Sequence, residues 1–183
     1  MNLSFGAGDS ASAYSFARRR EAYIAYAKDV TALPAYTAKA LGPILWNGAG
    51  NVSRNKVILL GVSIAVTTAS AAAVAVGVVT GTGQPNAPIT TTAATLMSSS
   101  YGDGSQPGAT FYNAGTVVNA PNTFLPVFTL DTAALTVQTS ANMFVPLDGL
   151  FVIPPGSYIA LAASATATTS VLQVGFVWAE ASV

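Results

Sequence analysis

The feature that most constrains this fold is a long segment without a charged side chain, VILLGVSIAVTTASAAAVAVGVV at residues 57–79. Its length is enough for a transmembrane helix, which needs about 20 apolar residues. Arg54 and Lys56 would supply a basic flank on one side, but neither an anchoring residue nor an aromatic belt marks the other side. The membrane interpretation therefore rests on length alone.

The spacing of apolar residues within the segment favours strands. Large apolar residues occupy every second position in both halves of the segment: Ile58, Leu60, Val62, Ile64 and Val66, then Val74, Val76 and Val78. Period two and a high β-branched content are typical of half-buried strands. We expect two strands joined by a short loop, with one face covered by the domain core and the other by a neighbouring subunit. The chain is therefore not expected to span a membrane.

Charge is scarce and unevenly divided along the chain. Only 8% of the residues are charged, about a third of the ~25% that is usual in soluble domains. All seven Lys and Arg residues precede residue 57, whereas residues 57–183 carry only acidic charges. A chain with so few charges is expected to have part of its surface covered by lipid or by other subunits.

Residues 1–43 predict an N-terminal arm. A helix is expected at about residues 10–30, because Phe16, Tyr23, Ala27 and Val30 fall near one helical face. Residues 31–43 contain Pro34, Gly42 and Pro43 and predict an extended linker. The arm is basic and holds four of the seven tyrosines, and tyrosine suits contact surfaces that are half apolar and half wet.

Residues 44–183 predict one antiparallel β domain, a sandwich or a barrel. Candidate strands alternate with breaks that are rich in Gly, Pro, Asn and Ser, and that alternation is typical of such folds. The expected strands are 44–46, 56–67, 72–80, 88–96, 110–118, 123–130, 134–139, 143–147, 149–153, 157–163 and 171–178. Asp148-Gly149 is interpreted as a hairpin turn, and Trp178 as a core residue.

The sequence offers little that would support catalysis. Without cysteine or histidine, the chain cannot form disulfides, zinc sites of the Cys/His type, cysteine nucleophiles or serine–histidine triads. Asp103, Asp131, Asp148 and Glu180 are far apart in sequence, and their spacing defines no carboxylate pair. We therefore expect neither an enzyme nor a cofactor or metal site.

Residues 44–180 resemble the jelly-roll domains of capsid decoration (cement) proteins of tailed bacteriophages. Three stretches carry the resemblance: ILWNGAGNVSRNKVILLGVSIAV at 44–66, VPLDGLFVIPPGSYIALAASATAT at 145–168 and VLQVGFVWAE at 171–180. In these proteins a Trp-Asn turn leads into a long strand, a Pro-Gly turn precedes a strand of small residues, and the closing strand ends in Trp and an acidic residue. The resemblance covers about three quarters of the chain.

The resemblance implies a mainly β protein with an antiparallel jelly-roll sandwich at residues 44–183. The helix-containing arm at residues 1–43 rests on composition alone, because its helix matches no pattern of the family. It also implies a virion structural protein on the capsid exterior, a homotrimer that stabilises the shell by bridging copies of the major capsid protein. The arm residues expected to contact the shell are Tyr14, Phe16, Arg18, Arg19, Arg20, Tyr23, Tyr26 and Tyr36.

Several alternatives stay open at this stage. Arg18–Arg20 also suit the solvated face of a helix, and they make too small a basic field for us to expect nucleic-acid binding. The tyrosines also suit packing on their own domain. A receptor- or glycan-binding knob of a tail fibre or spike is the alternative function, with Tyr101, Asp103 and Tyr112 as its aromatic and acidic loop cluster.

Overall fold

The computed structural model describes residues 21–48, 56–68, 70, 72–83, 85–86, 95–99, 107–130, 142–167 and 170–181. This part of the chain is built from strands and contains no helix. Every pairing between named strands is antiparallel. The prediction of a mainly β, antiparallel protein is therefore confirmed.

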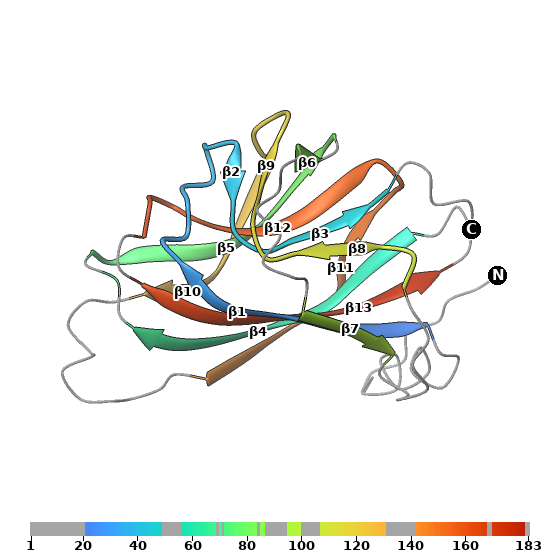
Figure 1. Cartoon of the computed structure of the whole chain (residues 1–183), viewed down its shortest axis with the longest axis horizontal. Coiled ribbons are helices and arrows are strands. Elements are labelled where there is room, and N and C mark those ends of the chain that lie inside the picture. The colour runs from blue at the N-terminus through green and yellow to red at the C-terminus, as the bar shows by residue number, and fades with distance from the viewer. Residues whose placement is uncertain are drawn as a thin grey trace.

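Two five-stranded sheets lie face to face, and a small third sheet lies on the far side of one of them (Figure 1). Sheet A has the order β11 (Asn142–Ile153), β4 (Lys56–Thr68), β13 (Val171–Ala181), β1 (Ala22–Thr31) and β7 (Thr95–Ser99). Sheet B has the order β10 (Thr123–Leu130), β5 (Val74–Thr82), β12 (Ser157–Ala163), β3 (Ile44–Asn47) and β8 (Thr110–Tyr112). The small sheet has the order β2 (Ala40–Leu41), β9 (Gly115–Val117) and β6 (Pro85–Asn86).

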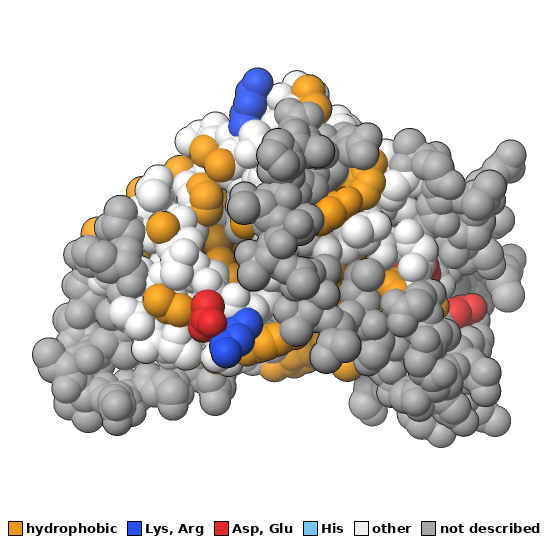
Figure 2. All heavy atoms as spheres, viewed as in Figure 1, with side chains coloured by type: hydrophobic (Ala, Val, Ile, Leu, Met, Phe, Trp, Pro, Cys, Tyr) orange, Lys and Arg blue, Asp and Glu red, His pale blue; other side chains and the backbone are white. Residues whose placement is uncertain are grey.

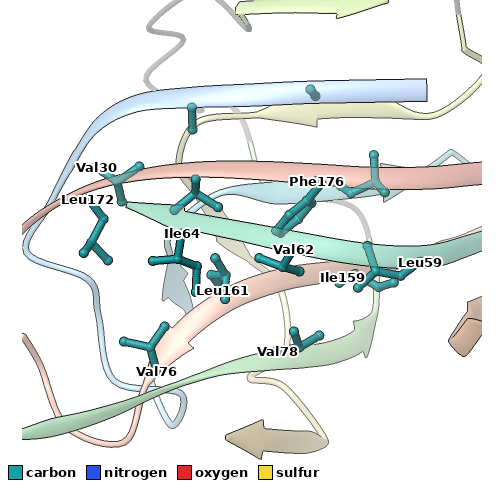
Figure 3. Close-up of a cluster of buried hydrophobic side chains, with 14 of the residues drawn as sticks. Val30, Leu59, Val62, Ile64, Val76, Val78, Ile159, Leu161, Leu172 and Phe176 are labelled. Carbon is teal, nitrogen blue, oxygen red and sulfur yellow. The ribbon is translucent and has the colours of Figure 1, made fainter. Parts of the chain in front are cut away.

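The main core fills the space between sheets A and B. Its side chains come mostly from alternate positions of the facing strands, as Figure 3 shows for Val62 and Ile64 of β4 opposite Ile159 and Leu161 of β12. The largest buried side chain is Trp178, which is fully buried as the sequence predicts. Tyr23 packs against it with the ring centroids 5.9 Å apart. The alternation of large and small residues along each strand therefore decides which face enters the core.

The predicted helix at residues 10–30 is wrong for residues 22–30, which belong to β1. Ala25 and Ala27 point into the core together with Tyr23, a period of two. The register shifts between Ala27 and Val30, where Asp29 adopts a φ of 54°, and this irregularity returns Val30 to the core side. The extra residue produces the spacing of Tyr23, Ala27 and Val30 that imitates a helical stripe.

β1 also changes the expected role of the arm. It pairs with β13 on one side and with β7 on the other, so residues 22–31 are part of sheet A. They do not form a separate arm. Residues 1–20 of the predicted arm lie outside the described residues, whereas residues 32–43 are described.

The uncharged segment 57–79 forms two strands, β4 and β5, as predicted. The two strands lie in different sheets, so the connection between them crosses the sandwich. Within the described residues we found no helix that is both long enough and apolar enough to cross a membrane.

The predicted turn at Asp148-Gly149 is wrong. Both residues have positive φ, 43° and 81°, as such a turn requires, but they lie inside the continuous strand β11. The pairing of β11 with β4 shifts register between Pro146 and Phe151, so the irregularity is a bulge within an edge strand. Of the other expected strands, 134–139 and most of 88–96 lie outside the described residues.

Candidate functional surface

The outer face of sheet A is the most unusual surface in the described part of the chain. Strand register places the outward side chains of four neighbouring strands on it. These residues are Ile24 and Tyr26 of β1, Gln173, Gly175 and Val177 of β13, Ile58, Ser63 and Ala65 of β4, and Phe144 and Val152 of β11. None of these ten is charged, and the outward cations of the same strands, Lys56 of β4 and Lys28 of β1, lie beyond them toward the strand ends. We refer to this set as the outer face of sheet A.

Large apolar side chains on this face are exposed at both of its sides. Phe144 and Val152 are 57% and 47% exposed, and Ile24, across the sheet, is 42% exposed. Leu150, in the bulge of β11, is 67% exposed. Figure 2 shows the molecule from the side, where hydrophobic side chains are frequent on the described surface and charged side chains are scattered. Large exposed apolar side chains gathered on one face of a sheet point to an interaction site.

The centre of the outer face of sheet A is lined by small residues. Gly175 of β13 pairs with Ser63 of β4, and Ala65 of β4 pairs with Gln173. A Cβ atom added at Gly175 would collide with the Ser63 hydroxyl. The middle of the face therefore carries small side chains between the larger ones of β11 and β1, and we refer to the three positions Ser63, Ala65 and Gly175 as the trough.

Sheet B differs from sheet A because segments of the same chain cover its outer face. Residues 33–43 run along β12, with backbone bonds from Tyr36 N to Ala163 O (2.8 Å) and from Gly42 N to Leu161 O (3.1 Å). A second core cluster lies beneath this cover: Leu41, Ile44, Trp46, Val79, Val117, Tyr158, Ala160 and Ala162. β12 is consequently buried on both faces along its whole length.

The same arrangement of a proline opposite a glycine occurs in both sheets. Comparing the two shows that the outer face of sheet B is covered and that of sheet A is exposed. On β10, Pro126 stands opposite Gly77 of β5, and on β11, Pro146 stands opposite Gly61 of β4. In each case a phenylalanine two residues before the proline lies over the glycine, Phe124 in sheet B and Phe144 in sheet A. Tyr36 stacks on Phe124 with the ring centroids 4.8 Å apart, whereas more than half of the Phe144 side chain is exposed.

The buried acidic residue serves the fold. The Glu180 carboxylate accepts hydrogen bonds from Gly108 N (2.8 Å), Ala109 N (2.9 Å) and Trp178 Nε1 (3.2 Å). These bonds tie the segment before β8 to the end of β13, and they occupy both carboxylate oxygens. Across the described ranges, no cluster of three or more acidic side chains is arranged to hold a metal ion.

The predicted contact residues have different locations. Tyr23 is 8% exposed and belongs to the core, so it has little surface to offer a partner. Tyr26 lies on the outer face of sheet A, and Tyr36 covers sheet B. The remaining members of that set lie outside the described residues: Tyr14, Phe16, Arg18, Arg19 and Arg20.

The alternative glycan cluster is only partly described. Tyr101 and Asp103 lie outside the described residues. Tyr112, on β8, packs against the covered cluster of sheet B.

Sequence reasoning anticipated part of the outer face of sheet A. The small, polar alternate positions of β4 led to the expectation that a neighbouring subunit covers one face. Phe144, Val152 and Ile24 were missed, although Phe-Val-Pro at 144–146 repeats the Phe-Leu-Pro pattern of 124–126. That repetition was the available signal for two equivalent edge strands.

In comparisons with known proteins, no family model, no curated protein and no solved structure matches the chain.

Proposed function

We propose that this chain is a structural protein of a virus particle, a jelly-roll decoration (cement) protein that binds the outside of a bacteriophage capsid shell and stabilises it. The observation that carries the proposal is the outer face of sheet A, which suits adhesion between protein subunits. Its ten positions carry no charge, so a protein partner can cover them without desolvating an ion.

The strand connectivity supports the jelly-roll interpretation. Eight strands form two four-stranded layers, β1-β13-β4-β11 and β3-β12-β5-β10. Every connection between consecutive members crosses from one layer to the other, except that from β5 to β10, which are neighbours in sheet B. This is the double Greek key expected of a jelly roll, an architecture used by viral capsid and lectin domains. β7 and β8 then extend the layers at one side.

The proposed mechanism is adhesion without catalysis. Residues 1–20, with Tyr14, Phe16 and the Arg18–Arg20 run, attach the sandwich to the major capsid protein. Because a homotrimer presents three such segments at once, its attachment is much tighter than that of one segment. The sandwich starts at β1, so the attaching segment is shorter than the predicted arm of 43 residues.

Particle composition tests this proposal. The chain should be present in purified virions at a copy number comparable to that of the major capsid protein, measured by quantitative mass spectrometry. A few copies per particle would favour the receptor- or glycan-binding knob, and absence from particles would refute a virion role.

A binding assay tests the attachment segment separately. The full chain carrying Arg18→Ala, Arg19→Ala and Arg20→Ala together should co-sediment with undecorated shells much less than the unchanged chain. The matched control carries Lys28→Ala and Lys39→Ala, which remove two exposed cations from the sandwich. Equal loss in both variants would mean that the arginine run has no special role.

A further inference from the structure

We propose that the outer face of sheet A is the surface through which copies of this chain pack on one another, with the Phe144 side of one copy seated in the trough of the next. The inference deepens the proposed function, since it assigns a surface through which copies of a decoration protein associate. It concerns contacts between copies, however, and can be tested without a capsid shell.

The shape of the face favours a second copy as the occupant. The face carries exposed apolar side chains on β11, Phe144 and Val152, and a trough of small residues at Gly175, Ser63 and Ala65. The Phe144 ring lies over Gly61 of its own chain, and its exposed side can fit against residues without bulky side chains. One copy therefore supplies both halves of a self-complementary contact, and two such faces packed on each other form a two-fold interface in which each Phe144 meets the other copy's trough.

The charges of the face agree with self-packing. Its ten outward positions are uncharged, and the nearest cations on its strands stand at opposite ends, Lys56 at the start of β4 and Lys28 near the end of β1. A face of one sign would repel its own copy, and an uncharged centre does not. A strongly acidic or basic partner would find no opposite charge in this centre.

The size of the face is adequate for a stable contact. Four strands spaced ~4.8 Å apart, each contributing about eight residues at ~3.3 Å per residue, give a flat footprint of roughly 500 Å². Because the protruding side chains add to that flat area, the face approaches the roughly 800 Å² per partner of a standard protein interface.

Sheet B indicates which kind of side chain would cover the Phe144 ring in the assembly. The equivalent ring, Phe124, is stacked by Tyr36 of the same chain. On sheet A the half-buried tyrosine is Tyr26, which pairs with Gly175 at the far side of the trough. Phe144 of one copy would therefore meet Tyr26 of the next across the trough.

Sedimentation of the purified full chain tests the proposal. Analytical ultracentrifugation over a range of concentrations should detect a discrete oligomer, and Phe144→Asp should raise its dissociation constant by about 30-fold or more, the effect of removing an interface hot spot. Ala65→Arg, which places a charge in the trough, should do the same. The matched control, Val118→Asp, changes an equally apolar residue that is 46% exposed after β9 and should leave assembly unchanged.

A mixture of the two single variants distinguishes direct contact from a general effect on the fold. When the Phe144→Asp chain is mixed with the Ala65→Arg chain, the introduced carboxylate of one copy faces the introduced guanidinium of the other, so assembly should partly return. Circular dichroism should detect the same β structure in every variant.

Three results would overturn the proposal. The first is a full chain that stays monomeric at about 100 μM, a concentration that detects even weak micromolar interfaces. The second is an oligomer that neither single variant weakens. The third is a chain that assembles only after residues 1–20 are removed, which would identify that segment as the cover of the face. A failure to bind shells, with assembly intact, would refute the proposed function alone.

Discussion

The outer faces of the two sheets both carry large apolar side chains, but those of sheet B are covered and those of sheet A are exposed. Sheet B carries Trp46, Tyr158 and Phe124 on its outer side, and residues 33–43 with the small sheet cover them. Sheet A carries Phe144, Val152 and Ile24 on its outer side, and these remain exposed in the described structure. Apolar residues on both faces of a strand therefore indicate that both faces are buried. They do not indicate whether the covering residues belong to the same chain.

The largest expected difference between the two faces concerns folding stability. Tyr158→Ala should lower the free energy of unfolding by ~3–5 kcal/mol, because it empties a fully buried site of a large aromatic side chain. Phe144→Ala should lower it by less than ~1 kcal/mol in the dissociated chain, since its ring is mostly in water already. Urea denaturation at low, fixed concentration measures both changes. Equal losses of unfolding free energy in the two variants would mean that the two outer faces do not differ in their contribution to stability.

Alkaline pH should affect the covered face. Burial raises the pKa of Tyr158 from 10.0 to about 12. The unfolded chain therefore releases this proton at lower pH than the folded chain, so the stabilising contribution is complete below pH 10 and is lost as the pH rises to 12. The loss amounts to ~2–3 kcal/mol.

Tyr158→Phe isolates this effect. The variant loses the hydrogen bond from Tyr158 Oη to Asn119 O (3.2 Å) at every pH, but it should not show the extra fall between pH 10 and 12. Denaturation curves at several pH values give the comparison. Parallel falls in both proteins would place the alkaline sensitivity elsewhere in the chain.

The paired glycines provide a smaller, matched test. A Cβ at Gly77 would lie 2.5 Å from the backbone oxygen of Leu125, which cannot move without distorting the β10–β5 pairing. At Gly61 the nearest atoms belong to the exposed ring of Phe144, which can swing outward. Gly77→Ala should therefore cost ~1–3 kcal/mol and Gly61→Ala less. The reverse order in thermal or urea denaturation would contradict the assignment of Phe144 as a movable side chain.

The smallest expected effect concerns an exposed ion pair near the end of β1 in sheet A. Lys28 Nζ is 3.8 Å from the Asp29 carboxylate, and the two side chains are 66% and 62% exposed. Lys28→Ala should change the free energy of unfolding by no more than ~0.5 kcal/mol, because water screens such pairs. A larger loss in urea denaturation would mean that charge at the edge of the face contributes to the fold.

Sequence periodicity predicted the strands that lie wholly in the sandwich, and its two errors have local causes. β4, β5, β12 and β13 were found because their large residues recur with period two. β1 was mistaken for a helix because the irregularity at Asp29 shifts the period, and because its alanines favour helices.

The second error concerned the bulge in β11. Asp148-Gly149 was mistaken for a turn because a bulge with positive φ requires the same residues as a hairpin. The covering of sheet B by residues 33–43 depends on long-range backbone hydrogen bonds to β12, and a local sequence pattern cannot predict such bonds.

The central claim is that the chain covers one sheet itself and that another copy covers the other sheet. Thiol labelling tests it directly, because the chain has no cysteine of its own. Ala65→Cys places a thiol on the outer face of sheet A, and Ala162→Cys places one in the covered cluster of sheet B. The thiol at position 162 should be protected at every protein concentration, and that at position 65 should be labelled rapidly in dilute solution and slowly once copies associate. A labelling rate at position 65 that does not change with concentration would contradict the claim.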